Sequence, residues 1–98
     1  MTPLTDAVAQ MLADIFPIKA RDAARQLIAE RCGSSLPLAS PECEPASFDR
    51  IRFAVIKLSA GDLERLRRVI DRAHADWRDI LLAAGFGEDI NAHLSWNP

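Results

Sequence analysis

The sequence has no tyrosine, only four glycines and two cysteines, and no long apolar run. Its longest apolar stretch, 80–86, covers seven residues even with its glycine counted. A membrane-spanning helix needs roughly twenty. The first residues also lack the basic and apolar regions of a secretory signal peptide. These absences predict a cytoplasmic protein that neither crosses nor binds a membrane.

The few metal-ligating residues are far apart in the sequence. Cys32 and Cys43 are separated by a proline-rich stretch without a CxxC motif, and His74 and His93 follow much later. The ligands of a structural zinc site usually lie at short, regular spacings in the sequence. In a reducing compartment, cysteine thiols usually do not form disulfides. We therefore expect no metal, no cofactor and no disulfide, although the sequence leaves open whether these four side chains meet in space.

The charge balance and the missing motifs narrow the classes of function. Twelve basic and fourteen acidic residues give a net charge of −2, which argues against general polyanion binding. The chain contains no P-loop, no GxGxxG, GxSxG or HExxH motif and no EF-hand loop. No catalytic residues are assigned on this basis, and a non-enzymatic role is favoured.

The composition predicts one all-α domain. The chain has 98 residues, 49% of them hydrophobic, which is enough for a single core without disulfides. Alanine is frequent, and no long run of alternating β-branched residues indicates a strand. We expect a compact bundle of four main helices with a proline-rich middle loop and a short C-terminal helical tail. The helices are expected at about 3–15, 17–32, 47–58 and 60–84, with the loop at 34–46 and the tail at 87–98.

The last of these helices has the clearest pattern. Apolar residues recur at alternating spacings of three and four, without interruption, at Leu63, Leu66, Ile70, Ala73, Trp77, Ile80 and Ala84. Such spacing is typical of one helix face packed on a core. The segment Ser59-Ala60-Gly61-Asp62 fits a capping box before it, and Gly85 ends it. A single long helix is therefore expected.

Several apolar residues lie away from these buried stripes. Leu82 falls opposite the long seam, Phe53 and Ile56 fall outside the stripe of their own helix, and Trp96 is close to the end of the chain. A larger apolar surface than one core can hide indicates a partner interface. We expect a protein-protein interaction or regulatory module, with a symmetric homodimer as one form. The alternative is a central third helix with two buried faces.

A second hypothesis concerns nucleic acid. Arg65, Arg68 and Arg72 share one outward stripe after a short turn, as in a helix-turn-helix DNA-binding regulator. An expected length of about 24 residues is long for a recognition helix. Acidic residues four positions from several arginines can also neutralise them within the helix, in the pairs Glu64–Arg68, Arg67–Asp71 and Arg72–Asp76. Nucleic acid is therefore the less favoured partner.

A third hypothesis is a small enzyme. His74 follows Asp71 by three residues, so the carboxylate could orient the imidazole as a general base. No nucleophile lies at a compatible spacing. The simpler interpretation is a histidine at the flank of a charged helix.

Overall fold

A computed structural model describes residues 3–33, 48–87 and 92–96. Within these ranges the chain is all-α, as expected, and forms five α-helices, one 3₁₀ turn and no strand. The expected loop at 34–46 and the first part of the expected tail lie outside the described residues. The elements are α1 (Asp6–Ile15), α2 (Ile18–Arg31), α3 (Asp49–Ser59), α4 (Leu63–Ala75), α5 (Trp77–Ala84) and the 3₁₀ turn η2 (Ala92–Ser95).

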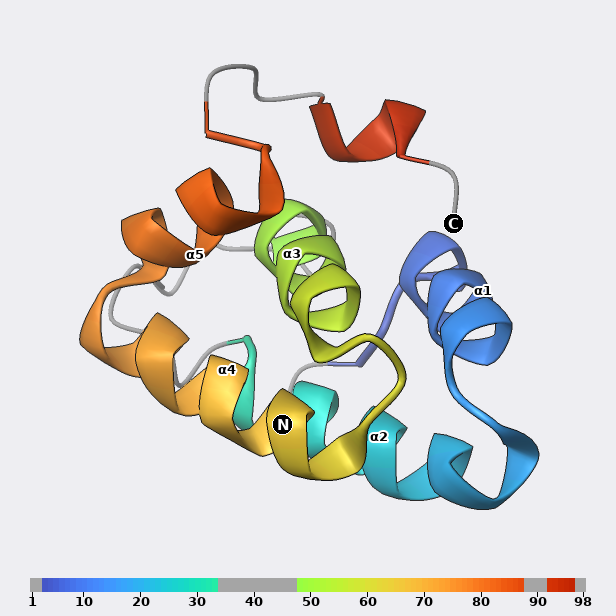
Figure 1. Ribbon diagram of the computed structural model, residues 1–98. Coiled ribbons are helices and arrows are strands. Elements are labelled where there is room, and N and C mark those ends of the chain that lie inside the picture. Colours follow the sequence, from blue (N-terminus) through green and yellow to red (C-terminus); the bar gives the residue numbers. More distant parts are fainter. Residues whose placement is uncertain (1–2, 34–47, 88–91, 97–98) are drawn as a thin grey trace.

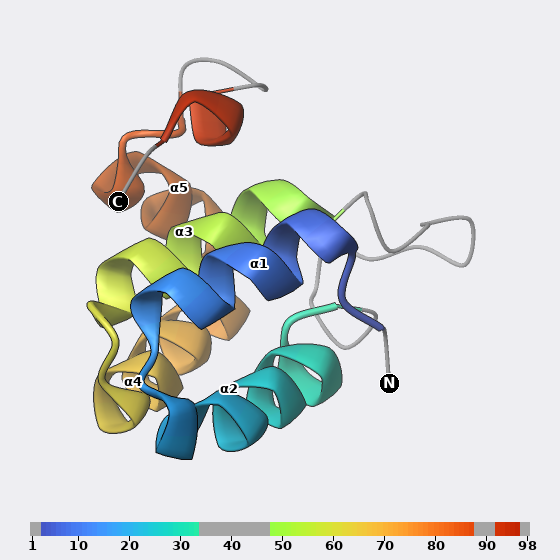
Figure 2. The same cartoon turned by 90° about the vertical axis from the view of Figure 1, so that its right-hand side faces the viewer.

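Helix α3 is the centre of the fold. Figure 1 shows it end-on, with α1 on one side, α5 on the other, and α4 and α2 below; Figure 2 shows α1 running alongside it. Six consecutive residues, 51–56, are buried, so α3 packs on all its faces over this stretch. A helix that is apolar around its circumference is stable only in such a central position. Helices α1, α4 and α5 cover α3, whereas α2 packs on α1 and α4.

A threonine cap begins α1, and a proline separates α1 from α2. Thr5 caps α1, because its Oγ1 accepts a hydrogen bond from the Val8 amide at 3.4 Å and donates one to Asp49 at 2.9 Å. Phe16 is extended, with φ −94° and ψ 140°, as a residue before proline usually is. Pro17 therefore separates α1 from α2. The first helix begins at Asp6, three residues later than expected.

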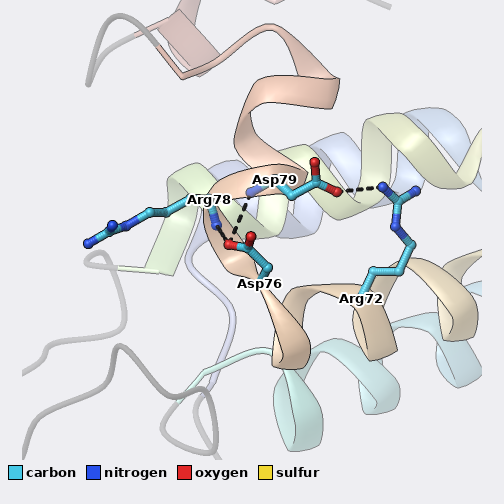
Figure 3. A network of polar contacts seen from close by, with 4 residues as sticks. All are labelled: Arg72, Asp76, Arg78 and Asp79. Carbon is cyan, nitrogen blue, oxygen red and sulfur yellow. Dashed lines mark hydrogen bonds and ion pairs between the residues drawn. The ribbon is translucent and has the colours of Figure 1, made fainter.

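The expected single helix over 60–84 is in fact two. Asp76 adopts an extended conformation (φ −156°, ψ 92°) between α4 and α5. Its amide donates to the Arg72 carbonyl at 2.7 Å, and its Oδ1 accepts from the amides of Arg78 and Asp79 at 3.2 and 3.4 Å (Figure 3). One residue thus ends α4 and caps α5. The apolar periodicity continues through this break, which is why it did not reveal the division.

The turn between α3 and α4 also differs from expectation. Ser59 ends α3 instead of capping α4: its buried hydroxyl donates to the Ile56 carbonyl at 2.6 Å. Ala60 and Gly61 take positive φ values of 53° and 82°, and Asp62 then caps α4 by accepting from the Glu64 amide at 3.0 Å. The capping residue is therefore the aspartate, three positions later than predicted.

A buried arginine joins the N-terminal segment to α2 and α3. Arg52 is 0% exposed, and it donates from Nε to the Cys32 carbonyl at 2.7 Å and from Nη1 to the Pro3 carbonyl at 2.8 Å. Burial lowers the pKa of its guanidinium, while the neighbouring Cys32 and Asp49 oppose this shift. The carbonyls that follow α2 and precede α1 are thereby satisfied from the central helix.

None of the helices in the described ranges is both long and apolar enough to cross a membrane.

Candidate interaction site

Two of the four residues expected at an interface belong to the core. Phe53 is 4% exposed and Ile56 is 0% exposed, so neither offers surface to a partner. Their placement as surface residues is wrong, because α3 is surrounded on both faces by α1, α4 and α5, as in the alternative of a central helix.

Trp96 is half-buried and packs on the same cluster. Its ring lies 6.3 Å from the Phe53 and Phe86 rings, and the Lys57 ammonium lies 5.9 Å from its centroid. The ammonium also lies 4.9 Å from the Phe86 ring and donates to the Ala84 carbonyl at 2.7 Å. These contacts hold η2 against α3 and the end of α5. Trp96 therefore has a packing role that is visible within the chain.

Leu82 is the interface candidate that remains on the surface, with 67% of its area exposed. It lies at a hollow of about 340 Å³ between α5, the start of α3 and the residue after Phe86. We call this hollow the α5 groove. Among the described residues, its lining includes Arg50, Trp77, Arg78, Leu81, Leu82 and Gly87.

The end of α5 shapes one wall of the α5 groove. A Cβ on Gly87 would lie 2.5 Å from Leu82 Cδ2, so the absence of a side chain there lets the backbone pass directly over Leu82. The preceding carbonyl, of Phe86, accepts two hydrogen bonds from Arg50, from Nε at 3.1 Å and from Nη2 at 2.5 Å. Arg50 thus ties the start of α3 to this wall and keeps its guanidinium at the rim.

Arg78 provides the second positive charge at the rim. Its guanidinium carbon lies 5.2 Å from the centroid of the Trp77 ring, a cation–π distance. Figure 3 shows its side chain extending away from Asp76 and Asp79. Within the described ranges, neither Arg50 nor Arg78 has a carboxylate at ion-pair distance. The α5 groove therefore combines leucine and tryptophan surface with two arginines that carry no carboxylate partner from that part of the chain.

The three arginines of the nucleic-acid hypothesis all lie exposed on α4. Arg65, Arg68 and Arg72 line a second hollow, of about 440 Å³, together with Asp62 and Val69. We call this surface the α4 arginine face.

The ion pairs on α4 differ in part from those its sequence predicts. Arg68 pairs with Glu64 as expected, at 4.0 Å, but Arg67 also pairs with Glu64, at 3.6 Å, instead of with Asp71. Arg72 pairs with Asp79 of α5 at 2.6 Å instead of with Asp76 (Figure 3).

His74 and Asp71, the residues of the enzyme hypothesis, both contact Arg31 of α2. His74 lies with Nε2 2.5 Å from the Arg31 carbonyl oxygen, which can only accept, so Nε2 donates. Asp71 forms an ion pair with the Arg31 guanidinium at 2.7 Å. Both side chains thus join α4 to the end of α2. An arrangement in which Asp71 orients His74 as a base is not what the structure shows.

The possible metal ligands are likewise occupied by packing. Cys32 is buried, and burial raises the pKa of its thiol to about 12, against a smaller opposite effect of Arg52. His93 packs 5.2 Å from the Phe53 ring. Cys43 lies outside the described residues. Over residues 3–33, 48–87 and 92–96, no three histidine, cysteine or acidic side chains group so as to hold a metal ion.

Sequence reasoning found Leu82 but missed the residues around it. Trp77 was assigned to the buried seam, although it is only half-buried, and Arg50 and Arg78 were not singled out. The available signal was Asp76 followed by Asp79, an acidic cap and first turn that mark a new helix.

No family model, no curated protein and no solved structure matches this chain.

Proposed function

We propose that this protein is a non-enzymatic interaction module whose α5 groove binds an apolar side chain of a partner protein that carries neighbouring carboxylates. The observation that supports this is the composition of the groove. A leucine that is 67% exposed and a half-buried tryptophan lie between two arginines without a carboxylate partner in the described part of the chain.

The apolar part of the groove supplies affinity. Burying a leucine side chain on binding is worth about 1.5–3 kcal/mol, and interface energy concentrates on tryptophan, arginine and their apolar neighbours. Trp77 offers a rigid apolar surface beside Leu82. A partner side chain of the size of leucine or phenylalanine suits a hollow of about 340 Å³.

The arginines favour a different protein over a second copy of this chain. A symmetric dimer formed through the α5 groove would bring Arg50 and Arg78 of both copies into one interface. Like charges brought together in this way disfavour association, whereas carboxylates of a partner would satisfy both guanidinium groups. The partner chemistry is therefore an acidic segment with an apolar anchor.

A display library of random 16-residue peptides, selected on the immobilised protein, tests this proposal. We expect the recovered peptides to share an apolar residue with aspartate or glutamate close by. Leu82→Asp should weaken the best peptide by at least tenfold, because it removes apolar contact and adds a charge that repels the carboxylates.

Leu94→Asp is the matched control, since Leu94 of η2 is 66% exposed but does not line the groove. It should leave binding within twofold of the wild type. Equal losses from both leucine variants, or selected peptides rich in lysine and arginine, would contradict the proposal. A concentration-dependent dimer that Leu82→Asp dissociates would show instead that the groove serves self-association.

A further inference from the structure

The α4 arginine face belongs to the helix pair α3–α4, whose second helix is shorter than the sequence predicts. Helix α3 is seen end-on in Figure 1 while α4 lies across the view, and Figure 2 shows the reverse, so the two helices cross steeply. Residues 60–62, with Gly61 at their centre, connect them. Steeply crossed helices joined by a turn of three or four residues that contains glycine form the helix-turn-helix arrangement. At 13 residues, α4 also has an ordinary length for its second helix.

The α4 arginine face is directed outward from this pair. The side chains of Arg68 and Arg72 are 75% and 59% exposed, and Arg65 is exposed as well. From Arg65 to Arg72 the helix advances about 10 Å, at 1.5 Å per residue. That length exceeds one phosphate group and suits consecutive phosphates of a nucleic-acid strand.

The ion pairs on this face are exposed: Arg72 pairs with Asp79 at 2.6 Å, and the two side chains are 59% and 52% exposed. Arg65 has no carboxylate at ion-pair distance among residues 3–33, 48–87 and 92–96, and Arg68 shares Glu64 with Arg67 at the outer limit of an ion pair. Exposed pairs of this kind contribute about 0–1 kcal/mol each. Phosphate oxygens, which accept two parallel hydrogen bonds from a guanidinium, compete well with them.

Two features of the same face decide between modes of nucleic-acid binding. The first turn of α4 carries Asp62 and Glu64, whose charges oppose deep entry of this end into a groove of DNA. The described residues that line this face include no aromatic side chain on which unpaired bases would stack. The geometry therefore points to the phosphate backbone of a duplex, contacted from outside, over base reading and over single strands.

We propose that the α4 arginine face binds the phosphate backbone of duplex DNA through Arg65, Arg68 and Arg72. This inference is independent of the α5 groove, because none of the residues that the structure describes lines both surfaces.

Fluorescence anisotropy with a labelled 20-base-pair duplex tests it. Each neutralised phosphate contributes about −0.9 to the slope of log affinity against log salt, so three contacts give about −2.7. Affinity should then fall about 40-fold between 50 and 200 mM salt. The double variant Arg65→Gln with Arg68→Gln should retain one contact and fall only about 3.5-fold over the same range.

A matched double variant on α2, Lys19→Gln with Arg25→Gln, removes the same charge from two other exposed residues. It should keep the wild-type slope. Circular dichroism establishes that both variants retain the native helix content. The inference is overturned if both double variants reduce the salt slope equally, or if no duplex binding occurs at 50 mM salt. It is also overturned if the single strand binds more tightly than the duplex. Displacement of the duplex by inorganic triphosphate at equal phosphate concentration would overturn it as well.

Discussion

Gly61 is the residue whose replacement should disturb the fold most directly. It has φ +82°, and a Cβ at this position would lie 2.7 Å from the Ile15 carbonyl oxygen, a backbone atom at the end of α1. A side chain would therefore meet both a disfavoured conformation and a contact that cannot yield without moving a helix.

We expect Gly61→Ala to lower the free energy of unfolding by about 2–3 kcal/mol, measured by urea denaturation. Gly85→Ala is the control, because Gly85 has the same φ of +82° but its Cβ would meet only the flexible end of Lys57, at 3.9 Å. That variant should lose about 1 kcal/mol. Equal losses would show that the contact with α1 contributes nothing.

Cys32 gives a second prediction at the residue scale. Burial raises the pKa of its thiol from 9.0 to about 12, so the folded protein keeps the proton while the unfolded chain loses it above pH 9. The associated stabilisation is fully present below pH 9 and is lost as the pH rises toward 12, by up to about 1.4 kcal/mol per pH unit.

Urea denaturation at pH 8, 9 and 10, in a Cys43→Ser background, measures this loss. Between pH 9 and 10 the free energy of unfolding should fall more steeply with Cys32 present than in Cys32→Ala. Parallel pH profiles would mean that the Cys32 thiol ionises as easily in the folded protein as in the unfolded chain.

At the scale of elements, the division between α4 and α5 depends on Asp76. The apolar residues Ala73, Trp77 and Ile80 keep helical spacing across the break, so periodicity alone predicts one helix. The Asp76 carboxylate starts a new helix instead, because it accepts hydrogen bonds from two amides at the start of α5. Local capping chemistry, and not the apolar pattern, sets this boundary.

Asp76→Ala should lower the melting temperature by about 4–8 °C, the equivalent of about 1 kcal/mol in a domain of this size. Asp76→Asn, which retains an oxygen that can cap α5, should lower it by less than half as much. Calorimetry measures both. If the alanine variant melts with the wild type, the cap is not what divides the helices.

The contrast between apolar pattern and local chemistry explains which features of the fold and the candidate site could be predicted from the sequence. Composition and periodicity predict an all-α fold, because they report average burial. They could not place Phe53 and Ile56, since a stripe on one face does not reveal whether the opposite face is covered by another helix. Leu82 was identified because it lies on the opposite side of its helix from the seam. Arg50 and Arg78 were not, because their rim positions depend on how α3 and α5 pack.

At the scale of the whole molecule, the two proposed binding activities belong to two separate surfaces. The net charge of −2 conceals a local arrangement in which arginines line both hollows, the α5 groove and the α4 arginine face. Figure 3 shows Arg78 and Arg72 on either side of Asp76 and Asp79, with the Arg78 side chain directed away from Arg72. The division at Asp76 places these two surfaces on separate helices.

The most direct test of the proposed function is nuclear magnetic resonance mapping of the peptide site. The ¹⁵N- and methyl-labelled protein is titrated with the best acidic peptide from the library. We predict the largest shift changes at the Trp77 indole, the Leu82 methyl groups and the Gly87 amide, which line the α5 groove. Changes centred instead on Leu94, or on Arg65 and Arg68 of α4, would contradict the assignment of the groove as the binding site.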